Sequence, residues 1–116
     1  MSNMLQVGGT DGFLEVSFIE KNILDESNIQ QIGRELDAAV GETKAPKLIL
    51  DFGNVEHLSS AALGILITMN KKVQDLGGGM SLANIRPAIF EIFKITRLDR
   101  VFSVHETVAE ARESLG

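Results

Sequence analysis

The feature that most constrains the fold is the short run Lys47–Phe52, which is apolar on both faces of an extended strand. A strand with one face in water alternates apolar and polar residues, whereas a continuous apolar run such as Leu48–Leu50 is typical of a central strand that is covered on both sides. The chain has too few helices to cover two faces well. We therefore expect the N-terminal hairpin or a terminal helix to mask part of the second face.

The residues before this strand predict a β-hairpin. Met4–Val7 forms a short first segment, and residues 8–12, which include three glycines, supply a turn. Apolar residues then alternate along Phe13–Ile19, with Leu14, Val16 and Phe18 on one face. Two alternating segments joined by a glycine-rich turn are the pattern of an antiparallel pair.

Apolar residues at helical spacing predict four helices. In chain order, these are a helix from about Asn28 to Val40, a helix over Ser59–Leu76, a helix that starts at Arg86-Pro87, and a C-terminal helix after Thr107. Ser27 with Gln30, and Thr107 with Glu110, match capping boxes at two of the starts. In the second helix we expect one apolar face to pack on the sheet; it consists of Ala62, Leu66, Met69, Val73 and Leu76.

Short strands at Met80–Ala83 and Val101–Phe102 complete an alternation of strands and helices. This alternation predicts parallel pairing with right-handed crossovers. The expected fold class is α/β, with a mixed sheet of about four to five strands, mainly parallel central strands, an N-terminal hairpin and about four helices. No linker, repeat or low-complexity segment interrupts residues 1–116, so we expect a single domain.

Composition narrows the classes of partner. A net charge of −5 argues against binding nucleic acid, which depends on neutralising phosphates with Lys and Arg. Without cysteine, the chain has no disulfide, thiolate metal site or cysteine nucleophile. No apolar stretch approaches the length of a membrane span, and the N-terminus lacks the pattern of a secretory signal. We expect a cytoplasmic protein with no membrane partner.

The sequence carries no recognisable enzyme motif. The glycine run Gly77–Gly79 follows a predicted helix and lacks the lysine of a phosphate-binding loop, so we interpret it as a helix terminator. Neither histidine stands in a metal-binding spacing, and the carboxylates offer none. We therefore expect no catalytic residue, no metal and no cofactor.

Ser59 and Ser60 lie where the loop after the central strand turns into the second helix. By pattern alone, this position favours helix capping, because serine side chains accept hydrogen bonds from the free N–H groups of a first turn. A phosphate here would also meet those N–H groups and the positive end of the helix dipole. Capping and phosphorylation are compatible, and the pattern leaves both open.

Longer motifs around these serines resemble the STAS domain of bacterial anti-anti-sigma factors. The segments that carry the resemblance are Ile23–Asp25, Leu48–Val55, Leu58–Leu66, Gly78–Ala83 and Ile92–Phe102. They occur in the family's order and span roughly residues 4–115, with Arg97 where glycine is usual. Several motifs in the right order carry more weight than any single one.

The resemblance implies roles for particular residues. In the family, the serine phosphorylated by the partner kinase stands second in an Asp-Ser-Ser/Thr-Gly motif. This place falls on Ser60, with Ser59 as the alternative. Ser59 replaces the family's Asp, and Ala62 replaces its Gly. The implied partner-binding residues are Asp25, Ser59, Ser60, Ala61, Ala62 and Gly64.

The function that the resemblance implies is that of an anti-sigma factor antagonist without enzymatic activity. The unphosphorylated protein would bind an anti-sigma factor or serine kinase and release a sigma factor. Phosphorylation of Ser60 would break this contact, and a PP2C-type phosphatase would restore it. The alternative is an accessory STAS subunit of a stress-signalling scaffold or lipid-transport complex, which binds through the same surface without phosphoryl control.

Overall fold

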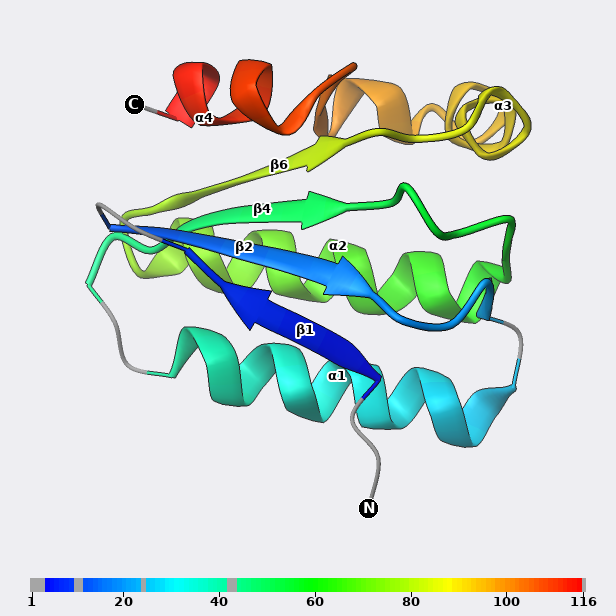
Figure 1. The fold of residues 1–116 in the computed structure, drawn as a ribbon, viewed down its shortest axis with the longest axis horizontal. Coiled ribbons are helices and arrows are strands. Elements are labelled where there is room, and N and C mark those ends of the chain that lie inside the picture. Colours follow the sequence, from blue (N-terminus) through cyan, green and yellow to red (C-terminus); the bar gives the residue numbers. More distant parts are fainter. Residues whose placement is uncertain (1–3, 10–11, 24, 42–43, 116) are drawn as a thin grey trace.

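The computed structural model describes residues 4–9, 12–23, 25–41 and 44–115. Its centre is a five-stranded sheet in the order β1-β2-β4-β6-β7 (Figure 1). The strands are β1 (Leu5–Gly8), β2 (Phe13–Phe18), β4 (Lys47–Asp51), β6 (Gly79–Ala83) and β7 (Ser103–His105). β1 pairs with β2 in antiparallel fashion, and the other neighbours are parallel. The predicted mixed sheet with an N-terminal hairpin is confirmed, although Thr10 and Asp11 of the predicted turn lie outside the described residues.

Helices cover the two faces of the sheet unequally. They are α1 (Glu26–Val40), α2 (Ser60–Asp75), α3 (Pro87–Ile95) and α4 (Val108–Leu115), with a 3₁₀ turn η1 (Leu98–Arg100) after α3. In Figure 1, α1 and α2 run together along one side of the sheet, and α4 lies beside β6. The four helices of the described chain agree with the expected number.

The main core lies between the sheet and the pair α1 and α2. From α2 it receives Ala62, Leu66, Met69 and Val73, all of them buried, and Leu76 is half-buried against it, as predicted. A smaller cluster on the other face joins Ile49 and Ala83 to Ala111 of α4. The terminal helix therefore masks the second face of the central strand, while the hairpin extends the sheet sideways.

Two very short strands were not predicted. β3 (Asn22–Ile23) and β5 (His57–Leu58) pair in parallel as a separate two-stranded sheet. Two residues are too few to show a period of two, so the sequence pattern contained no signal for them. The backbone N–H of Ser59 also donates to the carbonyl of Ile23 over 3.0 Å. These bonds hold the segment before α1 against the segment before α2.

The prediction of a strand at Val101–Phe102 is wrong, because β7 begins at Ser103. Phe102 is buried and its ring lies 5.8 Å from the ring of Phe93 in α3, measured between centroids. Phe102 is therefore apolar because it packs in the core from a turn, whereas Val101 is exposed.

The capping box predicted from Ser27 and Gln30 is also wrong, because α1 begins earlier than expected. Asp25 is the N-cap, and its Oδ1 accepts hydrogen bonds from the backbone N–H and the hydroxyl of Ser27, each over 3.0 Å. Asp25 stands two residues before Ser27, and its short carboxylate side chain reaches the N–H groups of the first turn. It therefore caps the helix in place of Ser27. At α4 the predicted cap holds, since Thr107 Oγ1 accepts from the N–H of Glu110 over 3.1 Å.

Candidate functional site

Ser60 is the first residue of α2 and is exposed. The structure shows no hydrogen bond between its hydroxyl and any described residue. A helix start leaves N–H groups without intrahelical partners and carries the positive end of the helix dipole. The hydroxyl of Ser60 is therefore accessible to another protein, at a position where added negative charge is compatible with the helix.

The neighbouring Ser59 is positioned differently. It is the N-cap of α2, it is half-buried, and its Oγ accepts a hydrogen bond from the N–H of Ala62 over 3.3 Å. The capping interpretation of the serine pair is therefore confirmed for Ser59. The two adjacent hydroxyls differ in accessibility and in bonding, so they are not equivalent as targets of a kinase.

Asp25 is exposed at the start of α1, and the β3–β5 pairing brings its segment beside the start of α2. Ile23 pairs with Leu58, one residue before Ser59, so Asp25 and Ser60 each follow closely on a paired strand residue. Leu24, which the resemblance includes, lies outside the described residues. Two segments far apart in sequence thus form one surface.

The other predicted site residues divide between this surface and the core. Ala61 and Gly64 are exposed, and a Cβ added at Gly64 would meet nothing within 4 Å. The side chain of Ala62 is 5% exposed and packs in the main core, so its methyl group faces the sheet and not the solvent. The surface around the start of α2 therefore contains Ser60, Ala61, Gly64 and Asp25; below, this set is called the α2-start surface.

The charges beside the α2-start surface are mostly acidic. Asp25, Glu26 and Glu56 are exposed, and Glu56 lies 3.8 Å from the ammonium group of Lys21. Such an exposed pair contributes little to stability and is screened by salt. The exposed charges on the segments that lead into α1 and α2 are therefore mainly negative.

A hydrogen-bond network at the carboxyl ends of β4 and β6 was not found by sequence reasoning. Asp51 Oδ1 accepts from the N–H of Gly53 over 2.9 Å and from Asn84 Nδ2 over 3.1 Å. Arg86 Nη2 donates to the carbonyl of Gly53 over 3.1 Å. The available signal was the succession Asp51-Phe-Gly53, since aspartate commonly bonds a backbone N–H two residues later. The network fixes the loop that leads to α2.

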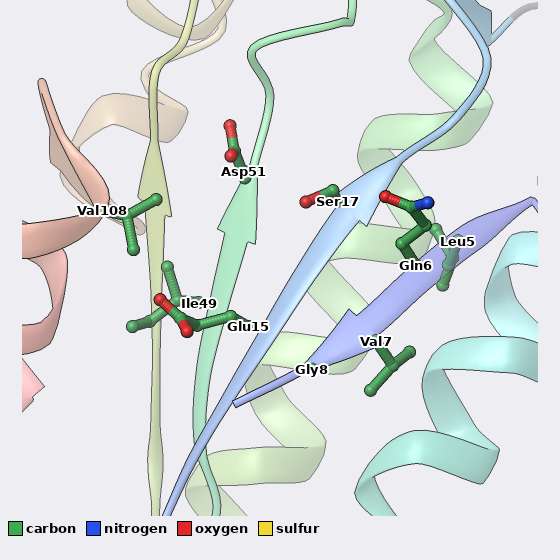
Figure 2. Close-up of a pocket in the computed structure, with 9 residues that line it drawn as sticks. All are labelled: Leu5, Gln6, Val7, Gly8, Glu15, Ser17, Ile49, Asp51 and Val108. Carbon is green, nitrogen blue, oxygen red and sulfur yellow. The ribbon is translucent and has the colours of Figure 1, made fainter. Parts of the chain in front are cut away.

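An open hollow lies on the sheet face opposite α1 and α2, beside α4 (Figure 2). Its lining residues are Leu5, Gln6, Val7, Gly8, Glu15, Ser17, Ile49, Asp51 and Val108. Figure 2 shows Glu15, Ser17 and Asp51 on adjacent strands, and the lining carries two carboxylates but no basic side chain. None of the α2-start residues belongs to this hollow, so the two features are separate.

Residues 4–9, 12–23, 25–41 and 44–115 contain neither a cluster of metal-ligating side chains nor a helix suited to crossing a membrane. Within these ranges, no three His, Asp or Glu side chains converge to hold a metal ion. Among the helices of the same ranges, none has the length and apolar character that crossing a bilayer requires.

The topology defines the class of protein. A β-hairpin leads into parallel strands, with α1 and α2 on one face and the C-terminal helix on the other, and this is the α/β architecture that the sequence motifs imply. The family model described as the STAS domain matches residues 5–111. The chain belongs to the STAS domain family.

Two similar sequences have names that place them among the anti-sigma factor antagonists. BtrV of Bordetella bronchiseptica is 27% identical over 94 residues, which are 81% of this chain and 77% of that protein. A protein of Thermotoga neapolitana is 30% identical over 69 residues, or 60% of this chain. That second match spans 61% of the Thermotoga protein, which is less than two thirds of its length.

Solved structures share the fold. An anti-sigma-factor antagonist (STAS) domain protein from Planctomyces limnophilus superposes with a TM-score of 0.87 at 23% identity, covering 100% of both chains. The phosphorylated form of the Bacillus cell fate determinant SpoIIAA gives a TM-score of 0.70 at 18% identity, covering 97% of this chain and 99% of that one. At these identities the likeness concerns the fold.

Proposed function

We propose that this protein is an anti-sigma factor antagonist whose binding is switched by phosphorylation of Ser60. The observation that carries the proposal is the pair of serines at the start of α2. Ser59 caps the helix, whereas the hydroxyl of Ser60 is exposed and makes no bond to a described residue. The names of the similar sequences and the existence of a phosphorylated SpoIIAA structure support the same conclusion.

In the unphosphorylated state, the α2-start surface binds an anti-sigma factor with serine kinase activity and thereby releases a sigma factor. The surface suits this role because its residues are small or short and stand on two anchored segments. Such a surface admits close approach and needs little reordering when a partner docks.

Phosphorylation changes this surface more than it changes the fold. A phosphate on Ser60 adds about −1.5 to −2 charges and three acceptor oxygens. It meets the N–H groups and positive dipole end of α2, so the helix tolerates it. The added charge and volume oppose docking of a partner that fits the unmodified surface.

The remaining parts of the proposal follow from this switch. The protein acts in the cytoplasm as a binding partner and has no catalytic turnover of its own. The anti-sigma factor kinase adds the phosphate, and a PP2C-type phosphatase removes it. No cofactor, metal, nucleic acid or membrane takes part.

Phosphosite mapping tests the proposal. The protein is incubated with ATP and a kinase-type anti-sigma factor from the same organism, and phosphopeptides are identified by mass spectrometry. We expect phosphate on Ser60 and none in Ser60→Ala, while Ser60→Ala still binds the kinase. Phosphate on Ser59 alone would overturn the assignment of the site. Phosphate on neither serine, with binding retained, would favour an accessory STAS subunit without phosphoryl control.

A further inference from the structure

A second exposed surface lies at the C-terminal end of α3 and in the η1 turn. It consists of Lys94, Ile95, Arg97, Arg100 and Val101, and is called the α3–η1 patch below. Ile95 is 79% exposed, more than any other large apolar side chain in the described chain, and Val101 is 49% exposed. These two exposed apolar residues are six positions apart in the chain, and the exposed charged residues Lys94, Arg97, Asp99 and Arg100 lie beside or between them in sequence.

The patch is basic although the protein is acidic. Residues 86–101 contain four basic and two acidic residues, in a chain with a net charge of −5. Lys94 forms an ion pair with Glu91, with 3.3 Å between Nζ and Oε1. Arg97 and Arg100 are exposed, and neither guanidinium forms an ion pair with a described residue. Their charges are therefore available to a partner.

Arg97 has a backbone conformation that is unfavourable for an arginine. Its φ is 62° and its ψ is 19°, in the left-handed region. Its N–H closes the end of α3 by donating to the carbonyl of Lys94 over 3.1 Å. Glycine adopts this conformation readily, whereas an arginine is strained there. Strained backbone conformations cluster at functional sites, and this one lies two residues after the exposed Ile95.

We propose that the α3–η1 patch is a docking surface for an acidic protein segment that also carries apolar side chains. Charge complementarity identifies this occupant, because a negative segment gains from both arginines while its apolar residues cover Ile95 and Val101. An anionic membrane fits less well. Binding to a membrane would require a longer apolar helix face than the nine residues of α3 provide. The negative membrane surface would also repel the rest of the protein, whose net charge is −5.

The patch is separate from the α2-start surface, so this inference does not rest on the proposed switch. Arg86, just before α3, is bonded to Gly53 in the loop that leads to α2. The patch lies at the other end of α3, about 13 Å away at 1.5 Å per helical residue. The two surfaces have no residue in common.

The test uses a synthetic 14-residue helical peptide with glutamates on one face and leucines on the other, titrated into the isotope-labelled full chain. We expect amide NMR shifts confined to residues 90–102 and binding that weakens as salt is raised. The variant with Arg97→Gly and Arg100→Gln should bind at least tenfold more weakly. Its matched control carries Lys44→Gln and Lys71→Gln, removes two exposed cations elsewhere, and should bind within twofold of the original chain.

Stability measurements separate lost binding from lost folding. Because glycine relieves the strain at this position, Arg97→Gly alone should unfold at the same or a higher temperature while binding the peptide less tightly. Absence of peptide binding, equal weakening in the control variant, or shifts centred on the start of α2 would overturn the proposal. It would also be overturned if phosphatidylserine vesicles, or a second copy of the chain, occupied the patch while the peptide did not.

Discussion

At the scale of single residues, two adjacent serines divide two tasks. Ser59 uses its hydroxyl to complete the first turn of α2, and Ser60 leaves its hydroxyl exposed. A capping hydroxyl and a phosphate can both use the free N–H groups of a helix start. Placing them one residue apart lets the helix remain capped whether or not the second serine is modified.

The division of tasks predicts unequal effects of two alanine substitutions. Ser59→Ala removes the cap and should lower the free energy of unfolding by about 0.5–2 kcal/mol. Ser60→Ala removes an exposed hydroxyl and should change it by less than about 0.5 kcal/mol. Urea unfolding of both variants checks this, and equal losses would show that the cap is misassigned.

Asp25 combines a structural bond with an exposed charge, and two substitutions separate them. Asparagine is also a good N-cap, so Asp25→Asn should preserve stability and weaken partner binding through the lost charge. Asp25→Ala removes the bonds to Ser27 as well and should cost about 0.5–2 kcal/mol of stability. Calorimetric titration and thermal unfolding give the two readouts. If Asp25→Asn keeps full affinity, the residue serves α1 only.

At the scale of elements, the sequence patterns predicted those elements that are long enough to show a period. The strand Lys47–Phe52 and the helix around Leu66 were recognised because their apolar spacing extends over several residues. The strands β3 and β5 were not predicted, since each has only two residues and so shows no apolar period. Phe102 led to the wrong prediction of a strand, because a buried aromatic residue in a turn gives the same apolar signal as a strand residue. Of the candidate site, the sequence predicted the residues but not the pairing that joins Asp25 to the start of α2.

Packing of α2 on the sheet gives a direct test of this element. Leu66 is 2% exposed, and Leu66→Ala should lower the free energy of unfolding by about 2–5 kcal/mol, as expected for a large-to-small change in a core. Its neighbour Ile67 is 42% exposed, so Ile67→Ala should cost much less. Chemical denaturation compares them. A loss below about 0.5 kcal/mol at Leu66 would mean that its face is assigned wrongly.

A substitution at Gly64 in α2 is expected to change the stability of the protein and its affinity for the partner in opposite directions. A Cβ there meets nothing within 4 Å, so Gly64→Ala should stabilise the protein by about 0.5–1 kcal/mol through higher helix propensity. If the partner approaches this exposed position closely, the added methyl group should weaken binding. Thermal unfolding and titration with the anti-sigma factor test both effects. Higher stability with full affinity would remove Gly64 from the contact surface.

At the scale of the whole molecule, the fold joins distant segments into a rigid platform. The sheet, with helices on both faces, anchors the start of α2, and the β3–β5 pair brings Asp25 to the same side. The α3–η1 patch lies at the far end of a different helix. A phosphate at Ser60 should therefore alter one docking surface without disturbing the fold or the second surface.

The most direct test of the switch compares the affinity of two forms of the protein for the anti-sigma factor kinase. One form is unmodified, and the other carries phosphoserine at position 60; calorimetry measures binding, and circular dichroism checks the fold. The account predicts unchanged secondary structure and at least tenfold weaker binding, about 1.4 kcal/mol, for the phosphorylated form. Equal affinity of the two forms would contradict it.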